Sequence, residues 1–315
     1  MIAFGPVPSR RLGSSLGINN IPPKICTYSC VYCQLGKTLK MQINRDAFYN
    51  PYNILNEVEQ KINDSIERGE QIDFLTFVPD GEPTLDVNLG KEIEIISGFN
   101  IKIVVISSSS LIWRDDVKDD LRKAHWVSLK IDTATENIWK IINKPIGTLN
   151  YDNILQGILD FSNIFNGELA TETMLIQNIN DSIEELKKVT DFIAKINPRK
   201  SYISIPIRPP AEGWAKSATE HSINTAYQIF KDKSIDTEYL ICYEGDNFAF
   251  TGNVEEDLLS ITLVHPMRKD SVAKFLKKAN ADWDIIIKLI NEDKLKEVKY
   301  KNKEFYIRRL DIIDS

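Results

Sequence analysis

Three cysteines, Cys26, Cys30 and Cys33, lie within one eight-residue segment, CTYSCVYC. Thiolates this close repel one another unless a metal neutralises them, and thiolate ligands select zinc or iron–sulfur clusters. A structural zinc site takes four protein ligands, and the fourth would have to be Cys242 or one of three histidines distant in sequence. A cubane held by three cysteines keeps one iron open for an exchangeable partner. The spacing favours an iron–sulfur cluster, with zinc and chance as alternatives.

A short turn of glycine, glutamate and proline is the second feature that suggests chemistry. Gly81, Glu82 and Pro83 follow the apolar run Asp73–Val78, which predicts a β-strand. The turn comes 48 residues after the last clustered cysteine, and the amphipathic stretch Tyr52–Arg68 between them predicts a helix. One βα unit therefore separates the two features. Parallel α/β folds place their chemistry after the carboxyl ends of strands, where this turn lies.

Predicted strands and helices alternate along most of the chain. The strands share short apolar cores and are Asp73–Val78, Lys102–Ser107, Trp126–Asp132, Leu169–Leu175, Tyr202–Ile207 and Glu238–Tyr243. The helices share amphipathic spacing and are Tyr52–Arg68, Val117–Ala124, Tyr151–Phe161, Ile183–Ile196 and Thr219–Lys231. This alternation predicts parallel βαβ units in an α/β barrel or open sheet.

The predicted strands have one polar face each. Side chains alternate along a strand with period two, so Lys130 and Asp132 share one face of Trp126–Asp132. Arg208 likewise falls on the face opposite the isoleucines of Tyr202–Ile207. A tightly packed eight-stranded barrel would be apolar on both faces. We therefore expect a sheet curved around a hydrated, ligand-filled lumen.

Residues 255–315 differ from residues 1–254 in pattern, and we expect a separate small domain there. Helices are predicted near Leu258–Val264, Lys269–Ala279 and Trp283–Glu292, before a hairpin over Leu295–Arg309 that turns at Lys301-Asn302-Lys303. Three helices and a basic hairpin resemble a winged helix. Residues 258–315 carry 13 basic and 9 acidic side chains, whereas residues 1–257 carry 26 and 36. The asymmetry suggests a module for a polyanion or an acidic partner, unless the lysines are only a solvated surface.

The composition of the 315 residues is that of a globular protein, with 43% hydrophobic and 27% charged residues. No apolar run approaches the roughly 18 residues of a membrane span, and we expect no signal peptide and no membrane partner. Four cysteines are too few and too clustered for a disulfide scaffold. These features favour a cytoplasmic protein with a metal site.

The cysteine segment resembles a known family. C-x3-C-x2-C with an aromatic residue, here Tyr32, before the last cysteine is similar to the signature of radical S-adenosylmethionine (SAM) enzymes. The Gly81-Glu82-Pro83 turn after a strand resembles the SAM-binding motif of the same family. The resemblance covers roughly residues 1–250 and implies an α/β fold, a partial (β/α)6-type radical SAM barrel. The small winged-helix-like domain would follow it.

The resemblance also implies roles for individual residues. Cys26, Cys30 and Cys33 would ligate three irons of a [4Fe-4S] cluster, and SAM would chelate the fourth. Backbone carbonyls of Gly81-Glu82-Pro83 would accept the SAM amino group, with Glu82 holding the turn. The remaining candidates would contact the adenine, the ribose, the carboxylate or the substrate; they are Tyr32, Ser107, Ser108, Lys130, Asp132, Glu172 and Arg208. An electron donor of the flavodoxin or ferredoxin class would reduce the cluster.

Several of these residues have structural alternatives. Ser107 and Ser108 belong to a serine run that is also typical of a turn. Lys130 and Asp132 are also compatible with an ion pair that fills the barrel. Cys242 is most often a small buried hydrophobe. Arg10 and Arg11 are candidates for binding an anionic substrate, or for surface ion pairs.

The segments FGPVPSRRLGSSLGIN and PDGEPTLD look most like the subgroup of tRNA-wyosine synthases and related iron–sulfur oxidoreductases. Those enzymes carry extra cysteines for a second cluster, whereas this chain has only Cys242 left. A second cluster of ordinary type is therefore excluded. One hypothesis is an enzyme acting on tRNA or another RNA, docked by basic residues of the tail: Lys299, Lys301, Lys303, Arg308 and Arg309. The alternative is a small-molecule or protein substrate, with the C-terminal domain as a lid or partner module.

Overall fold

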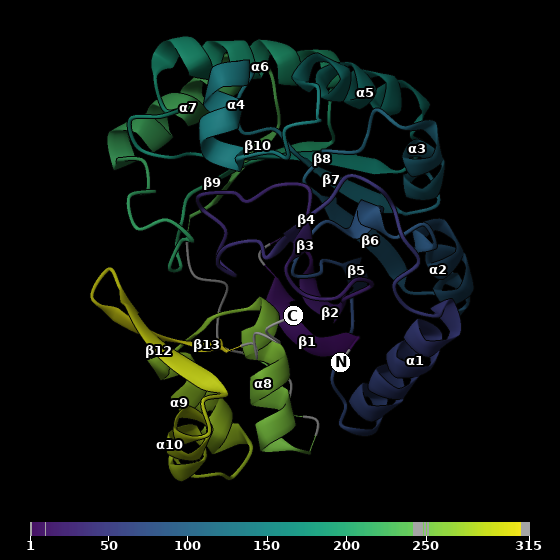
Figure 1. Ribbon diagram of the computed structural model, residues 1–315, viewed down its shortest axis with the longest axis vertical. Helices are drawn as coiled ribbons and strands as arrows, with labels where there is room; N and C mark the ends of the chain where they lie inside the picture. Colours follow the sequence, from purple (N-terminus) through teal and green to yellow (C-terminus); the bar gives the residue numbers. More distant parts are fainter. Residues whose placement is uncertain (1, 10, 242–247, 249, 251, 310–315) are drawn as a thin grey trace.

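The chain forms a curled parallel sheet with helices on its outside and a smaller C-terminal unit beside it (Figure 1). The computed structural model describes residues 2–9, 11–241, 248, 250 and 252–309. Over these residues the large sheet has the order β1-β2-β5-β6-β7-β8-β9-β10. Its strands are β1 (Ala3–Ser9), β2 (Gly13–Ile18), β5 (Phe74–Phe77), β6 (Lys102–Ser107), β7 (Trp126–Lys130), β8 (Glu168–Met174), β9 (Lys200–Ser204) and β10 (Thr237–Leu240). Strand β1 is antiparallel to β2, and every other pair is parallel.

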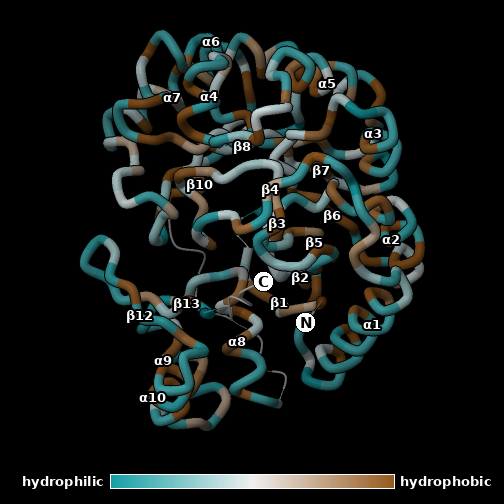
Figure 2. Tube along the Cα trace, viewed as in Figure 1, coloured by the Kyte–Doolittle hydropathy of each residue, from teal (hydrophilic) through white to brown (hydrophobic). Residues whose placement is uncertain are grey.

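Helices follow the strands and cover the convex face of the sheet (Figure 1). They are α1 (Pro51–Glu67), α2 (Leu89–Ile96), α3 (Asp115–Leu121), α4 (Glu136–Asn143), α5 (Tyr151–Ile164), α6 (Ile183–Ile196) and α7 (Glu220–Asp232). Local chemistry sets their starts: the side chain of Asn50 accepts a hydrogen bond from Tyr52 N at 2.9 Å, with Pro51 at the first helical position. The helices bury one apolar stripe each, which appears in Figure 2 as alternating brown and teal segments.

The two faces of the sheet carry different side chains, as the alternation along the strands predicts. Val127, Leu129 and Ile131 belong to the main core between sheet and helices. On the inner face, Trp126 and Tyr202 belong to a small apolar cluster that also includes Leu12, Val104, Ala170 and Leu240. Polar side chains occupy the inner face nearer the carboxyl ends. The curled half-barrel is the α/β architecture that the resemblance implied.

The sequence prediction placed all six of strands β5–β10 and missed the β1–β2 hairpin, whose β2 adds a seventh parallel strand. It also missed α2 and α4. Strand β9 ends at Ser204 rather than at Ile207, so Arg208 lies on the following loop and the strand placement of Arg208 was wrong. Pro206 has no N–H to donate to a ladder, which explains the early end. The predicted end of Glu238–Tyr243 falls partly outside the described residues.

The C-terminal unit has its own hydrophobic core, built around Leu258, Phe275, Leu289 and Tyr306. Its elements are α8 (Val254–Val264), β11 (Met267–Arg268), α9 (Lys269–Lys278), α10 (Asp284–Asn291), β12 (Leu295–Tyr300) and β13 (Lys303–Arg308), and the sheet order is β11-β13-β12. The three helices and the hairpin lie where the sequence predicted them. The hairpin tip, teal in Figure 2, turns through Lys301 and Asn302, both with positive φ. Within the part of the chain that the structure describes, no helix is long and apolar enough to span a membrane.

Candidate active site

The three clustered cysteines lie on one loop at the carboxyl edge of the half-barrel. Cys26 ends the short strand β3 (Ile25–Cys26), which pairs with β4 (Lys40–Met41), and Cys30 and Cys33 follow in the loop. All three are free thiols of intermediate exposure. No three His, Cys, Asp or Glu side chains among the described residues converge as the ligands of one metal ion do. A cubane instead distributes its cysteines over different irons.

Burial raises the pKa of all three thiols. The pKa of Cys30 rises to about 12, first through desolvation and then through the neighbouring charge of Asp132, although hydrogen bonding to Asn143 lowers it. Desolvation, with Cys30 and Glu82 nearby, also raises the pKa of Cys26. Without a metal these groups are therefore neutral thiols at neutral pH. Binding of a metal requires their thiolates and would release protons.

The Gly81 turn packs directly against the cysteine loop. The Glu82 amide donates to the Ile25 carbonyl at 3.3 Å, and the Lys24 amide donates to the Asp80 carbonyl at 2.7 Å. A Cβ at Gly81 would lie 1.9 Å from the Ile25 carbonyl oxygen, so only glycine permits this approach. The turn therefore presents bare backbone next to the first cysteine.

Glu82 is fully buried and joins the turn to the end of β6. Its carboxylate accepts hydrogen bonds from Thr84 N at 3.2 Å and Thr84 Oγ1 at 2.6 Å. It also accepts from Ser107 Oγ at 2.8 Å and from the Ser108 amide at 2.7 Å. Ser107 and Ser108 thus contact Glu82, and the Ser108 hydroxyl donates to Ser110 at 3.0 Å.

A charged network fills the inner face of strands β7 and β8. Lys130 Nζ lies 3.1 Å from Glu172 Oε1 and 3.8 Å from Asp132 Oδ1, and Arg11 pairs with the other Glu172 oxygen. Ser204 Oγ donates to Glu172 at 2.8 Å. Burial by itself would raise the pKa of Glu172, but Arg11 and Lys130 hold it well below the usual range. Lys130 keeps a raised pKa for the same reason: its two carboxylate neighbours outweigh desolvation.

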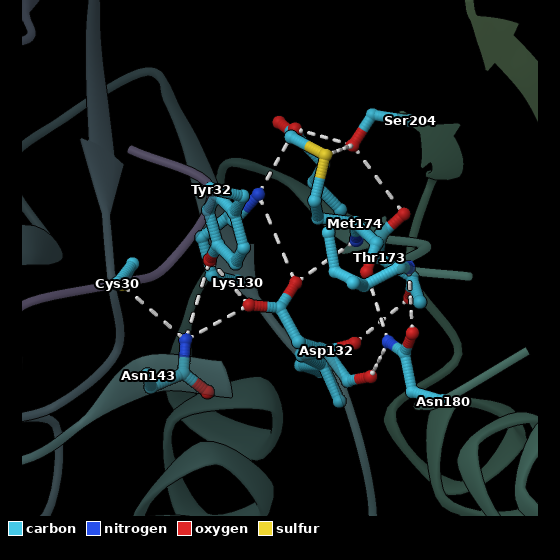
Figure 3. Close-up of polar contacts among 12 residues, drawn as sticks. Cys30, Tyr32, Lys130, Asp132, Asn143, Thr173, Met174, Asn180 and Ser204 are labelled. Carbon is cyan, nitrogen blue, oxygen red and sulfur yellow. Dashed lines mark hydrogen bonds and ion pairs between the residues drawn. The ribbon is translucent and has the colours of Figure 1, made fainter. Parts of the chain in front are cut away.

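A second set of hydrogen bonds ties the lumen to the cysteine loop (Figure 3). Asp132 Oδ2 accepts from the Tyr32 hydroxyl and from Asn143 Nδ2, the latter at 3.0 Å. Asn143 Nδ2 also lies 3.4 Å from Cys30 Sγ and 3.3 Å from Tyr32 Oη. Asn143 is 4% exposed, and the sequence analysis missed it because it ends a helix far along the chain. The other Asp132 oxygen accepts from the Met174 amide at 2.9 Å.

The lumen opens into a cavity of about 320 Å³ that reaches from the barrel to the C-terminal unit. Its walls include Arg11, Lys130, Glu172 and Arg208, together with His265 from the end of α8. Arg208 donates to Gln34 Oε1 at 2.7 Å and to His265 Nε2 at 2.7 Å. Sequence analysis did not assign His265 to the site, and no local pattern marks it.

Two of the three histidines, His125 and His221, are exposed on the surface. Cys242 and Arg10 lie outside the described residues. The thirteen predicted site residues lie in one region formed by the cysteine loop, the turn after β5, the ends of β6–β8 and the loop after β9. They are Cys26, Cys30, Tyr32, Cys33, Gly81, Glu82, Pro83, Ser107, Ser108, Lys130, Asp132, Glu172 and Arg208.

A curled half-barrel with a three-cysteine loop against a glycine turn defines a class of enzymes that bind an iron–sulfur cluster and SAM. The family model described as the Radical SAM superfamily matches residues 20–193. The chain belongs to the Radical SAM superfamily, whose enzymes use a [4Fe-4S] cluster and SAM.

Similar proteins extend this result. The chain is 46% identical over 311 residues to the UPF0026 protein MJ1312 of Methanocaldococcus jannaschii, covering 98% of this chain and 96% of that protein. A radical SAM methyltransferase from Sphaerobacter thermophilus has a TM-score of 0.54 at 13% identity, over 72% of this chain and 66% of that chain. TYW1, solved with a lysine–pyruvate adduct, has a TM-score of 0.50 at 14% identity, over 70% and 75% of the two chains. At these identities the solved structures show a shared fold.

The chemistry of the donor set fits the cofactors of the family. The same loop carries all three thiols, and the fourth cysteine of the chain is distant from them in sequence. Backbone at Gly81 lies against that loop with no side chain in the way. These residues suit a cluster with one iron left for SAM.

Proposed function

We propose that this enzyme holds one [4Fe-4S] cluster through Cys26, Cys30 and Cys33 and cleaves SAM reductively. When bound and reduced, the cluster supplies the electron that yields methionine and a 5′-deoxyadenosyl radical, which abstracts a substrate hydrogen. The observation that supports this best is the packing of the Gly81 turn on the Cys26 segment. It brings the proposed SAM-binding backbone beside the proposed cluster ligands.

The residues of this chain then have distinct tasks. Carbonyls of Gly81-Glu82-Pro83 accept the SAM amino group, and Glu82 keeps the turn in place through its bonds to Thr84 and β6. Tyr32 would contact the adenine. Lys130 and Asp132 offer polar contacts to the ribose or carboxylate from the wall of the lumen. The serines Ser107 and Ser108 support Glu82 as well as bordering the ribose site.

We propose that the substrate binds in the cavity between the barrel and the C-terminal unit, and that it is a small molecule or a protein segment. The hairpin tip contacts the barrel loop after β9: Tyr300 Oη donates to the Pro206 carbonyl at 3.1 Å, and Lys301 Nζ donates to Ser217 Oγ at 2.6 Å. His265 meets Arg208 on the same loop. The C-terminal unit, residues 255–315 and winged-helix-like in its element order, thereby acts as a lid that excludes water from the radical.

RNA is the second candidate substrate, and the basic hairpin is the observation in its favour. Lys299 and Lys303 border an open groove beside Trp283. However, Lys301 donates a hydrogen bond to Ser217 of the barrel. Arg308 donates to the Leu259 carbonyl at 3.3 Å, and Arg309 forms an ion pair with Asp293. These internal bonds leave fewer cations for phosphates than the sequence hypothesis assumed, so it ranks second.

Anaerobic reconstitution with iron and sulfide, followed by dithionite and SAM, tests the proposed function. The wild type should form 5′-deoxyadenosine, Cys30→Ala should not, and Cys242→Ala should match the wild type. A protein with a full cluster that forms no 5′-deoxyadenosine would reject the proposal. Deuterium transfer from candidate substrates into 5′-deoxyadenosine identifies the substrate. RNA binding to the full chain that weakens steeply with salt would favour the second candidate.

A further inference from the structure

Helix α4 lies against the cysteine loop through its last turn. The Val31 amide donates to the Ile142 carbonyl at 2.8 Å, and the Ser29 amide donates to the Asn143 carbonyl at 3.1 Å. A helix leaves its last carbonyls without partners inside the helix, and here amides of the loop satisfy two of them. The loop between the first and third cysteines is therefore fixed to the end of α4.

The side chain of Asn143 continues this contact to a thiol. Its Nδ2 lies 3.4 Å from Cys30 Sγ, 3.3 Å from Tyr32 Oη and 3.0 Å from Asp132 Oδ2. An amide nitrogen carries two hydrogens and accepts none. With one hydrogen directed to the Asp132 carboxylate, the second is directed to the Cys30 and Tyr32 side (Figure 3).

The neighbours of Asn143 prevent it from turning away. Asp132 is itself held by the Tyr32 hydroxyl, the Met174 amide and the Lys130 ammonium group. Asn143 and Asp132 are 4% and 5% exposed, so water competes little for the amide. The donor next to Cys30 is thus preorganised by the lumen network together with Tyr32 of the cysteine loop.

We propose that Asn143 is a positioning residue that donates a hydrogen bond to the Cys30 thiolate and raises the reduction potential of the cluster. The proposal rests on the proposed function, because it requires Cys30 to be a cluster ligand. A hydrogen bond to a ligand sulfur favours the reduced cluster, which carries more negative charge. Asn143 therefore makes the cluster easier for an electron donor to reduce.

The test compares Asn143→Leu with Asn180→Leu in cluster-loaded protein without SAM. Asn180 is also a buried amide, 1% exposed, and donates to the Asp132 and Met174 carbonyls, but it has no hydrogen bond to a thiol among the described residues. Redox titration followed by electron paramagnetic resonance gives the midpoint potential of each variant. We expect Asn143→Leu to shift it to more negative values, with the equilibrium constant for reduction lowered several-fold, and Asn180→Leu to leave it unchanged.

An unchanged potential in Asn143→Leu at full cluster content would overturn the proposal, and so would equal shifts in both variants, which would indicate a structural effect. If Asn143→Leu does not fold, Asn143→Asp keeps the side-chain size and replaces the donor with an acceptor, and its potential should fall as well. A wild type that assembles no cluster would instead count against the proposed function. The two failures are therefore distinguishable.

Discussion

The Glu82 carboxylate accepts a hydrogen bond from the Ser108 amide at 2.7 Å, across the gap between two neighbouring strands of the half-barrel. The bond links the turn after β5 to the turn after β6, and Thr84 and Ser107 complete the set of donors. Each donor is a backbone amide or a hydroxyl, so the position of the Glu82 carboxylate requires a side chain that accepts hydrogen bonds. The backbone of the Gly81 turn is thereby held in one shape before SAM arrives.

Replacing this acceptor should weaken SAM binding. Glu82→Gln directs an NH2 group at donors, and hydrogen bonds to charged groups contribute about 1.5–3 kcal/mol each. We expect at least a tenfold loss of SAM affinity in cluster-loaded protein, measured by calorimetry. Thr84→Val, which removes one hydroxyl donor and keeps the carboxylate, should show a smaller loss. Affinity within twofold of the wild type in Glu82→Gln would contradict the role of this carboxylate.

The contact between the hairpin tip and the barrel predicts a local change when it is lost. Lys301→Ala removes the hydrogen bond to Ser217, and an average hydrogen bond contributes about 1 kcal/mol. We expect amide hydrogen exchange in the loop after β9 to rise about fivefold, measured by mass spectrometry. Lys303→Ala changes an exposed lysine of the same hairpin and should leave that loop unchanged. Equal effects of both substitutions would argue against a closing contact.

Local patterns were sufficient for much of the fold and for part of the site. The amphipathic spacing of Ile183–Ile196 predicted α6 to the residue, and the cysteine spacing with the Gly81 turn predicted the cofactors. The β1–β2 hairpin was missed because its glycines, prolines and arginines hide the alternation of a strand. Asn143 and His265 have roles that depend on long-range packing, against Cys30 and Arg208. No residue type or spacing near them marks such contacts.

The ion pairs of Glu172 predict a loss of stability at low pH. Its pKa in the folded chain is depressed by Arg11 and Lys130. The stability that this carboxylate contributes is therefore complete above its unfolded pKa of about 4.3 and is lost progressively as pH falls from there towards the lower folded pKa. Glu172→Gln leaves two buried cations without their shared partner, which costs about 3 kcal/mol. Urea unfolding of cluster-free protein at pH 7 measures this loss. Glu168→Gln, at the exposed start of the same strand, should cost much less, and equal losses would contradict the prediction.

A second buried carboxylate predicts the opposite pH dependence. Glu92 on α2 is fully buried, and burial together with the Asp86 charge raises its pKa to about 9. A raised pKa means that the folded state binds a proton which the unfolded chain releases near pH 4.3. The stability contributed by Glu92 is therefore complete below about pH 4 and is lost progressively as pH rises towards 9. In Glu92→Gln the side chain is neutral at every pH, so the variant does not lose this stability as pH rises.

We therefore expect Glu92→Gln to unfold at higher urea concentration than the wild type at pH 8, by about 2 kcal/mol or more in free energy. The difference should shrink as pH falls and disappear below about pH 4, where Glu92 is protonated in the folded state and in most unfolded molecules. Glu94→Gln is the control, because Glu94 lies on the same helix but is exposed and pairs with Lys123 at 2.8 Å. A gain that does not vary with pH would show that packing, and not the charge of Glu92, sets the stability of α2.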